Sequence, residues 1–167
     1  MSHLSQRVYA SISILIADAD RMSAHLIADG LTRGRNDIVV VAVSNSSDET
    51  IRELEKNRPD IALINAHLKD GRLRGYHVLQ YLQVLSPKTV AIMLIPDSER
   101  DLVVNAFRGG ARGVFCRVQP IKLLRNVFEP CTRVRSGLTP GIWLISSKIS
   151  LSSSRCASSN QAVGWPG

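Results

Sequence analysis

Short apolar runs alternate with amphipathic stretches over the first two thirds of the chain. The runs are four to eight residues long and rich in β-branched side chains, which predicts buried strands. Between them, apolar residues recur at helical spacing and predict helices that each bury one face. We expect five strands, at residues 11–17, 38–43, 60–66, 89–95 and 113–116.

Residues that start and stop helices separate these elements. Either Asp18 or Asp20 can cap the first helix, and the run 46–49 (SSDE) reads as a capping box for the second. Asp97 or Ser98 can cap the fourth helix, and Pro120 fits the first turn of a fifth. The expected apolar faces are Met22, Leu26, Ile27 and Leu31; Ile51 and Leu54; Val78, Leu79, Leu82 and Leu85; Leu102, Val103, Ala106 and Phe107; and Ile121, Leu124, Val127 and Phe128.

Five strand–helix units with continuously apolar strands predict an α/β fold, with a parallel sheet covered on both faces. Right-handed crossovers favour the flavodoxin-like, doubly wound strand order 2-1-3-4-5. In such a sheet the functional loops follow the carboxyl ends of the strands. Candidate chemistry is therefore expected at the ends of the first, third, fourth and fifth strands.

The chain divides into an N-terminal extension (1–10), a domain (11–129) and a Ser-rich tail (130–167). Within the tail, residues 141–145 (GIWLI) predict either a short strand or an exposed apolar segment, and 146–167 predict disorder or weak docking. The net charge of +7 is concentrated after residue 116, where the sequence has seven basic residues and one acid. A basic tail suits nucleic acid, an acidic partner or an anionic surface, but it is more often simply solvated.

Several function classes find little support. Three widely spaced cysteines without a Cys-x-x-Cys pair argue against zinc or redox chemistry. His67, Asp70 and His77 have no metal-ligand spacing and are expected as solvated loop residues. No Gly-rich phosphate loop or Ser/His/Asp set favours an enzyme. No apolar run is long enough for a membrane span or a signal peptide, so we expect a cytoplasmic protein.

Three segments carry a resemblance to a known family. ILIAD (14–18), RPDIALIN (58–65) and AFRGGARGVFCR (106–117) resemble receiver domains of NarL/FixJ (LuxR-type) response regulators, over about residues 12–128. The resemblance implies a CheY-like fold and a role in two-component signal transduction and transcription regulation. In such receivers an aspartate ending the third strand accepts a phosphoryl group, and two acids after the first strand help to hold Mg²⁺. A Thr or Ser, an aromatic residue and a Lys complete the site.

This chain departs from that pattern at most positions. Asp18 matches the first acid, but Ala19 stands at the second, with Asp20 beside it. Asn65 stands at the phosphoacceptor position. The Thr/Ser, aromatic and Lys positions, which we regard as pocket-lining switch positions, hold Ile95, Val114 and Arg117.

These replacements change the chemistry of the predicted pocket. A carboxamide is a poor nucleophile where phosphoryl transfer requires a carboxylate oxygen. Asp18 and Asp20 are compatible with weak Mg²⁺ binding at most, and a helix cap plus a surface acid is the favoured interpretation. Arg117 keeps a positive charge, so we expect it to pair with Asp18 or Asp20 and lock the pocket.

The sequence therefore predicts a non-enzymatic pseudo-receiver that acts through phosphorylation-independent protein contact. A protein partner or a second copy would bind through the fourth helix, fifth strand and fifth helix, with Val104 and Val118 as first candidates. The alternative is the regulatory half of a NarL-type DNA-binding regulator without its helix-turn-helix module, since no such pattern follows residue 130. Nucleic-acid binding is not expected without a further domain.

Overall fold

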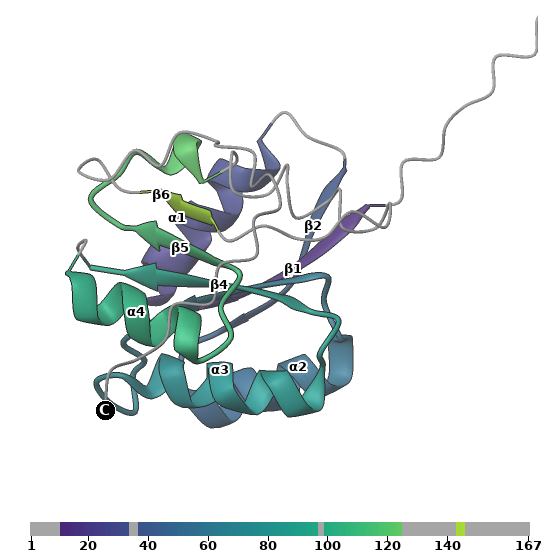
Figure 1. Ribbon diagram of the computed structural model, residues 1–167. Helices are drawn as coiled ribbons and strands as arrows, with labels where there is room; N and C mark the ends of the chain where they lie inside the picture. The colour runs from purple at the N-terminus through teal and green to yellow at the C-terminus, as the bar shows by residue number, and fades with distance from the viewer. Residues whose placement is uncertain (1–10, 34–36, 97–98, 125–142, 146–167) are drawn as a thin grey trace, which may run out of the picture.

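The structure, a computed structural model, describes residues 11–33, 37–96, 99–124 and 143–145. A parallel sheet forms its centre, with helices on both faces (Figure 1). The strand order is β2-β1-β3-β4-β5-β6, which confirms the predicted order 2-1-3-4-5 and adds one strand beside β5. The strands are β1 (Ile12–Ala17), β2 (Ile38–Ser44), β3 (Ile61–Asn65), β4 (Val90–Ile95), β5 (Gly113–Cys116) and β6 (Trp143–Ile145).

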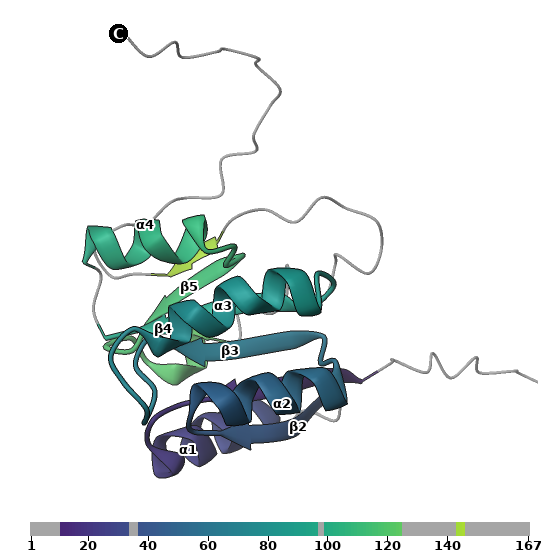
Figure 2. The same cartoon turned by 90° about the horizontal axis from the view of Figure 1, so that it is seen from below.

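Alternate strand residues build two cores, one on each face of the sheet. Ile14 and Ile16 of β1 face one way, and Leu15 and Ala17 face the other, as the two-residue period of a strand requires. The first core includes α1 residues, and the second includes residues of the other three α-helices. Figure 2 shows α1 on the opposite face of the sheet from α2, α3 and α4. The helices are α1 (Arg21–Thr32), α2 (Ser47–Asn57), α3 (Arg74–Leu85) and α4 (Arg100–Arg108), followed by a 3-10 turn, η1 (Ile121–Leu123).

The predicted apolar face of α1 is wrong in part. Ala24, Ile27 and Leu31 are buried against the sheet, whereas Met22 and Leu26 are 72% and 63% exposed. Met22 and Leu26 are four positions apart, so they form a stripe of their own on the helix. The stripe through Ala24, Ile27 and Leu31 faces the sheet instead, because only one stripe can do so.

The start of α2 follows its sequence signal closely. The Ser46 hydroxyl accepts a hydrogen bond from the Glu49 amide (3.4 Å), and the Glu49 carboxylate accepts one from the Asn45 amide (2.8 Å). This arrangement is close to the predicted capping box, shifted by one residue at its second bond. The cap position of α4 is Glu99, while the two predicted cap residues, Asp97 and Ser98, lie outside the described residues.

Of the predicted fifth helix, the structure describes only the turn η1 and the buried Leu124. The rest of its expected apolar face, Val127 and Phe128, lies outside the described residues. Cys116 is a buried free thiol, and the other two cysteines also fall outside the described part. Among the described helices, none combines the length and apolarity that crossing a bilayer requires.

Candidate functional site

The ends of β1, β3, β4 and β5 surround an open crevice, as expected for a parallel α/β sheet. Its volume is about 430 Å³. We call this hollow the strand-end crevice. It brings together the vestigial acids, the pseudo-phosphoacceptor position and the basic position that were predicted from sequence. Its lining residues are Asp18, Ala19, Asp20, Asn65, His67, Pro96, Arg117 and Val118.

An ion pair spans the crevice from β5 to β1. A terminal guanidinium nitrogen of Arg117 lies 2.9 Å from Oδ2 of Asp18. The Asp18 side chain is 1% exposed and the Arg117 side chain 33%. Oδ2 accepts no directed hydrogen bond within the described structure, so the attraction at this atom is the charge of the guanidinium. The other oxygen, Oδ1, accepts the backbone amide of Asp20 (3.0 Å).

Asp20 is the cap of α1, and it is exposed. Its carboxylate accepts the Met22 amide (3.1 Å), the Ser23 amide (3.2 Å) and the Ser23 hydroxyl (2.8 Å). The Ser23 hydroxyl and the two amides lower the pKa of Asp20 below its ordinary value, and the nearby Arg117 charge adds to this. Most acceptor capacity of this carboxylate is therefore already used by the start of the helix.

Asn65 lies at the end of β3 and is 4% exposed. Its Oδ1 atom accepts the backbone amide of His67 (3.2 Å). The two acids nearest to Asn65 in sequence, Asp60 and Asp70, bind other groups. Asp60, before β3, accepts hydrogen bonds from the Ser13 amide (2.9 Å) and hydroxyl (2.8 Å). Asp70 accepts hydrogen bonds from Ser47. Strand three thus presents an amide to the crevice and no carboxylate.

Close packing fixes the position of Asn65. Gly75, in the first turn of α3, approaches the end of β3, and a Cβ atom there would lie 2.0 Å from the Asn65 carbonyl oxygen. The Gly75 amide also donates to the Ala66 carbonyl (3.1 Å). Only glycine permits this approach, and the hydrogen bond to Ala66 joins the start of α3 to the end of β3.

Two predicted pocket-lining positions lie in the core instead. Ile95 ends β4 and Val114 lies within β5, and neither side chain is exposed. Both belong to the core that faces α2, α3 and α4. An apolar side chain at the end of β4 is stabilised by burial, whereas a hydroxyl there would require a polar partner.

A clasp between two loops was not predicted from sequence. Asp70, in the loop after β3, accepts hydrogen bonds from the Ser47 amide (3.1 Å to Oδ1) and from the Ser47 hydroxyl at the start of α2. The Lys69 amide donates to the Asn45 carbonyl (2.8 Å). His67 is half-buried, and its Nδ1 atom accepts the Leu73 amide (3.3 Å). Asp70 and His67 are therefore structural members of the loop, while His77 is exposed on α3.

The described donor set does not fit Mg²⁺, the cofactor that the resemblance implies. Mg²⁺ prefers several anionic oxygens in octahedral geometry. Here Asp18 is already paired with Arg117, Ala19 supplies no side-chain oxygen, and Asn65 supplies a neutral amide. Within the described chain, no group of three or more His, Cys, Asp or Glu side chains gathers as a metal site.

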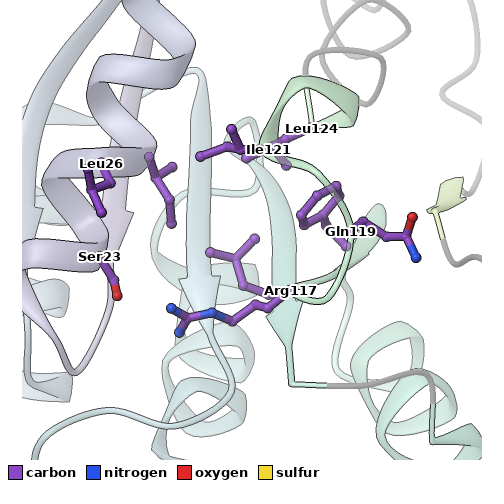
Figure 3. Close-up of a pocket in the computed structure, with 9 residues that line it drawn as sticks. Ser23, Leu26, Arg117, Gln119, Ile121 and Leu124 are labelled. Atoms are coloured by element: carbon purple, nitrogen blue, oxygen red, sulfur yellow. The ribbon is translucent and has the colours of Figure 1, made fainter.

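A second hollow lies between α1 and η1, with a volume of about 190 Å³. Figure 3 shows Arg117 extending toward Ser23 on α1, with Ile121 and Leu124 at the opposite end of the hollow. Arg117 therefore borders both this hollow and the strand-end crevice.

Comparisons with known proteins agree with this architecture. The family model described as "Response regulator receiver domain" matches residues 14–127. No curated protein has a significantly similar sequence. Among solved structures, a LuxR-family two-component response regulator from Aurantimonas has 17% identity and a TM-score of 0.69, covering 84% of this chain and 94% of that one.

Two further structures have the same fold. The receiver domain of the putative response regulator NarL from Mycobacterium tuberculosis has 14% identity and a TM-score of 0.66, covering 74% of this chain and 98% of that one. A CheY-like receiver from Methanospirillum hungatei has 18% identity and a TM-score of 0.66, covering 77% and 100%. The match of the family model over most of the chain shows that this protein belongs to the response regulator receiver domain family of two-component signalling.

Proposed function

We propose that this chain is a pseudo-receiver, which signals through protein contact without accepting a phosphoryl group. One observation carries the proposal: the Arg117–Asp18 ion pair spans a crevice in which Asn65 replaces the expected carboxylate. No catalytic step is assigned to the crevice.

The chemistry of the acceptor position supports the proposal. Phosphoryl transfer to a side chain requires an attacking anionic oxygen, and the Asn65 amide is neutral. The buried Ile95 cannot donate a hydrogen bond to a phosphoryl oxygen. Arg117 carries the compensating positive charge for Asp18, so a bound divalent cation would have to displace it. Asn65, Ile95 and Arg117 therefore each oppose acceptance of a phosphoryl group for a different chemical reason.

The ion pair also favours a single arrangement of the crevice. A switch needs two states that a ligand or modification can separate in free energy. Here the cation is a covalent part of the chain, so its attraction to Asp18 is always present. Output is therefore constitutive, set by the amount of protein and by its partners.

The contact surface that we propose comprises α4, β5 and the segment after β5. Val118 is 70% exposed next to the crevice, and Val104 on α4 is half-buried. Isolated exposed apolar side chains are common, but Val118 directly follows Arg117 and so links the crevice to this surface. A second copy of the chain is the partner to test first.

Light scattering of the full-length protein tests this function. We expect a mass above that of the monomer at tens of micromolar, unchanged by acetyl phosphate with Mg²⁺. Val118→Asp should shift the mass toward monomer. The matched control is Val84→Asp on α3, a residue that is 86% exposed, and it should leave the mass unchanged. A mass that responds to the phosphodonor would contradict the proposal.

A further inference from the structure

The outer edge of β5 is covered by a strand from the tail. β5 has four residues, all buried, and it pairs with β4 on one side. On its other side β6 pairs in parallel, with Gly113 opposite Trp143, Val114 opposite Leu144 and Phe115 opposite Ile145. Figure 1 shows β6 as the last strand of the sheet. The tail thus supplies the backbone partner for an edge that the five strand–helix units leave open.

An open strand edge has a defined chemistry. Its amide and carbonyl groups on that side have no ladder partner, and they can pair with any extended chain that fits. Adding a strand to such an edge is a recurrent mode of peptide recognition, in which the backbone supplies affinity. The segment that pairs here, Trp-Leu-Ile, consists of aromatic and aliphatic residues, including types with high strand propensity.

We propose that the outer edge of β5 is a strand-acceptor site for extended apolar peptides, which the chain fills with its own residues 143–145. The ligand class is a peptide of at least three consecutive apolar, strand-forming residues. Neither the strand-end crevice nor its charges take part in this site.

The strand β6, which occupies the site, can be replaced by another peptide. β6 is three residues long, and parallel pairing is slightly less stable per residue than antiparallel pairing. Short elements at a sheet edge open locally at low cost in free energy. Residues 117–142 connect β5 to β6, so β6 competes within the chain against any added peptide. An added peptide should therefore bind weakly unless the chain's own strand is removed first.

The site has a consequence for the proposed pairing of two copies. β5 belongs to the surface proposed for that contact, so β6 has to leave before a partner can reach the β5 edge. This consequence rests on the proposed function, whereas the strand-acceptor site does not. Peptide binding and oligomeric mass are separate readouts, so a failure of one is distinguishable from a failure of the other.

The test uses the full-length protein and a fluorescein-labelled peptide of residues 141–147 with two added lysines for solubility. Leu144→Pro places a proline at the centre of the three-residue β6 and should release it. We expect the peptide to bind this variant at least about tenfold more tightly than the wild type, by fluorescence anisotropy. Ser147→Pro, in the same tail but beyond β6, is the control and should behave as wild type. A peptide that itself carries Leu144→Pro should not bind.

Hydrogen exchange gives a second measurement that does not depend on the peptide. In the Leu144→Pro variant, the β5 amides that do not bond to β4 should lose protection, while amides of β1 keep theirs and show that the domain is folded. Added peptide should restore the lost protection. Equal peptide binding by wild type and variant, or unchanged β5 protection in a folded variant, would overturn the proposal.

Discussion

Arg117 lies 2.9 Å from the buried carboxylate of Asp18, so the basic residue that follows β5 neutralises the acid that follows β1. The two side chains differ in exposure, at 33% and 1%. A carboxylate buried to this degree requires a compensating charge or hydrogen bonds. In this chain the compensation comes from a side chain, together with one backbone amide from Asp20.

Removing the guanidinium should destabilise the fold. Arg117→Met leaves Asp18 buried with one hydrogen bond and no positive charge, and because Arg117 is one third exposed we expect a loss of about 2 kcal/mol in the free energy of unfolding. Urea denaturation measures this. Adding Asp18→Asn should recover about 1 kcal/mol, since the unpaired charge is then gone.

Arg112→Met is the matched control for this variant. Arg112 precedes β5, its side chain is exposed, and we expect a change within about 0.5 kcal/mol. Equal stability of Arg117→Met and Arg112→Met would show that the ion pair contributes nothing.

The lowered pKa values of Asp20 and Asp70 should make the free energy of unfolding fall at acid pH. Partial burial opposes ionisation of Asp70, but the hydrogen bonds from Ser47, a backbone hydrogen bond of Asp70 itself and the Arg74 charge together lower the pKa of Asp70. The Ser23 hydroxyl and the first amides of α1 lower the pKa of Asp20. A carboxyl group with a lowered folded-state pKa stabilises the fold above its unfolded-state pKa of about 4, and this stabilisation disappears as the pH falls through the folded-state pKa.

The expected result is an unfolding free energy that decreases from about pH 4 downward. Asp70→Asn should flatten this decrease, and Ser47→Ala should reproduce part of the effect by removing the hydroxyl donor. Urea titrations at several pH values between 2 and 7 measure it. If Asp70→Asn leaves the pH dependence unchanged, the clasp between the two loops does not act through its charge.

Gly75 sets the approach of α3 to the end of β3. Because a Cβ atom would lie 2.0 Å from the Asn65 carbonyl oxygen, Gly75→Ala should cost about 3 kcal/mol in the free energy of unfolding. The control is Gly30→Ala on α1, where a Cβ atom meets only the Ile121 side chain at 3.3 Å. That change should be neutral or stabilising by about 0.5 kcal/mol, because alanine favours the helix. Equal effects at both positions would contradict the close-approach argument.

The strand order and the site positions could be predicted because both follow from local patterns. Apolar runs fixed each strand to within a residue or two, and parallel topology places strand ends at one edge. That is why Asp18, Asn65 and Arg117 could be expected in one crevice before any contact was known.

Other features depend on tertiary contacts that no local pattern encodes. Met22 and Leu26 have helical spacing, but the sheet is contacted by the stripe through Ala24, Ile27 and Leu31. Ile95 and Val114 stand at pocket positions of the family's pattern, yet their apolar side chains are stabilised in the core. The Asp70–Ser47 clasp joins residues 23 positions apart, and the pairing of β6 with β5 joins residues about thirty apart.

The most direct test of the central claim is the intact mass of the full-length protein after incubation with acetyl phosphate and Mg²⁺. The account predicts an unchanged mass, because an amide stands at the acceptor position and a guanidinium compensates Asp18. Asn65→Asp alone should also remain unmodified, since Arg117, Ala19 and Ile95 still oppose acceptance. A stoichiometric phosphoryl adduct on the wild-type chain would contradict the account.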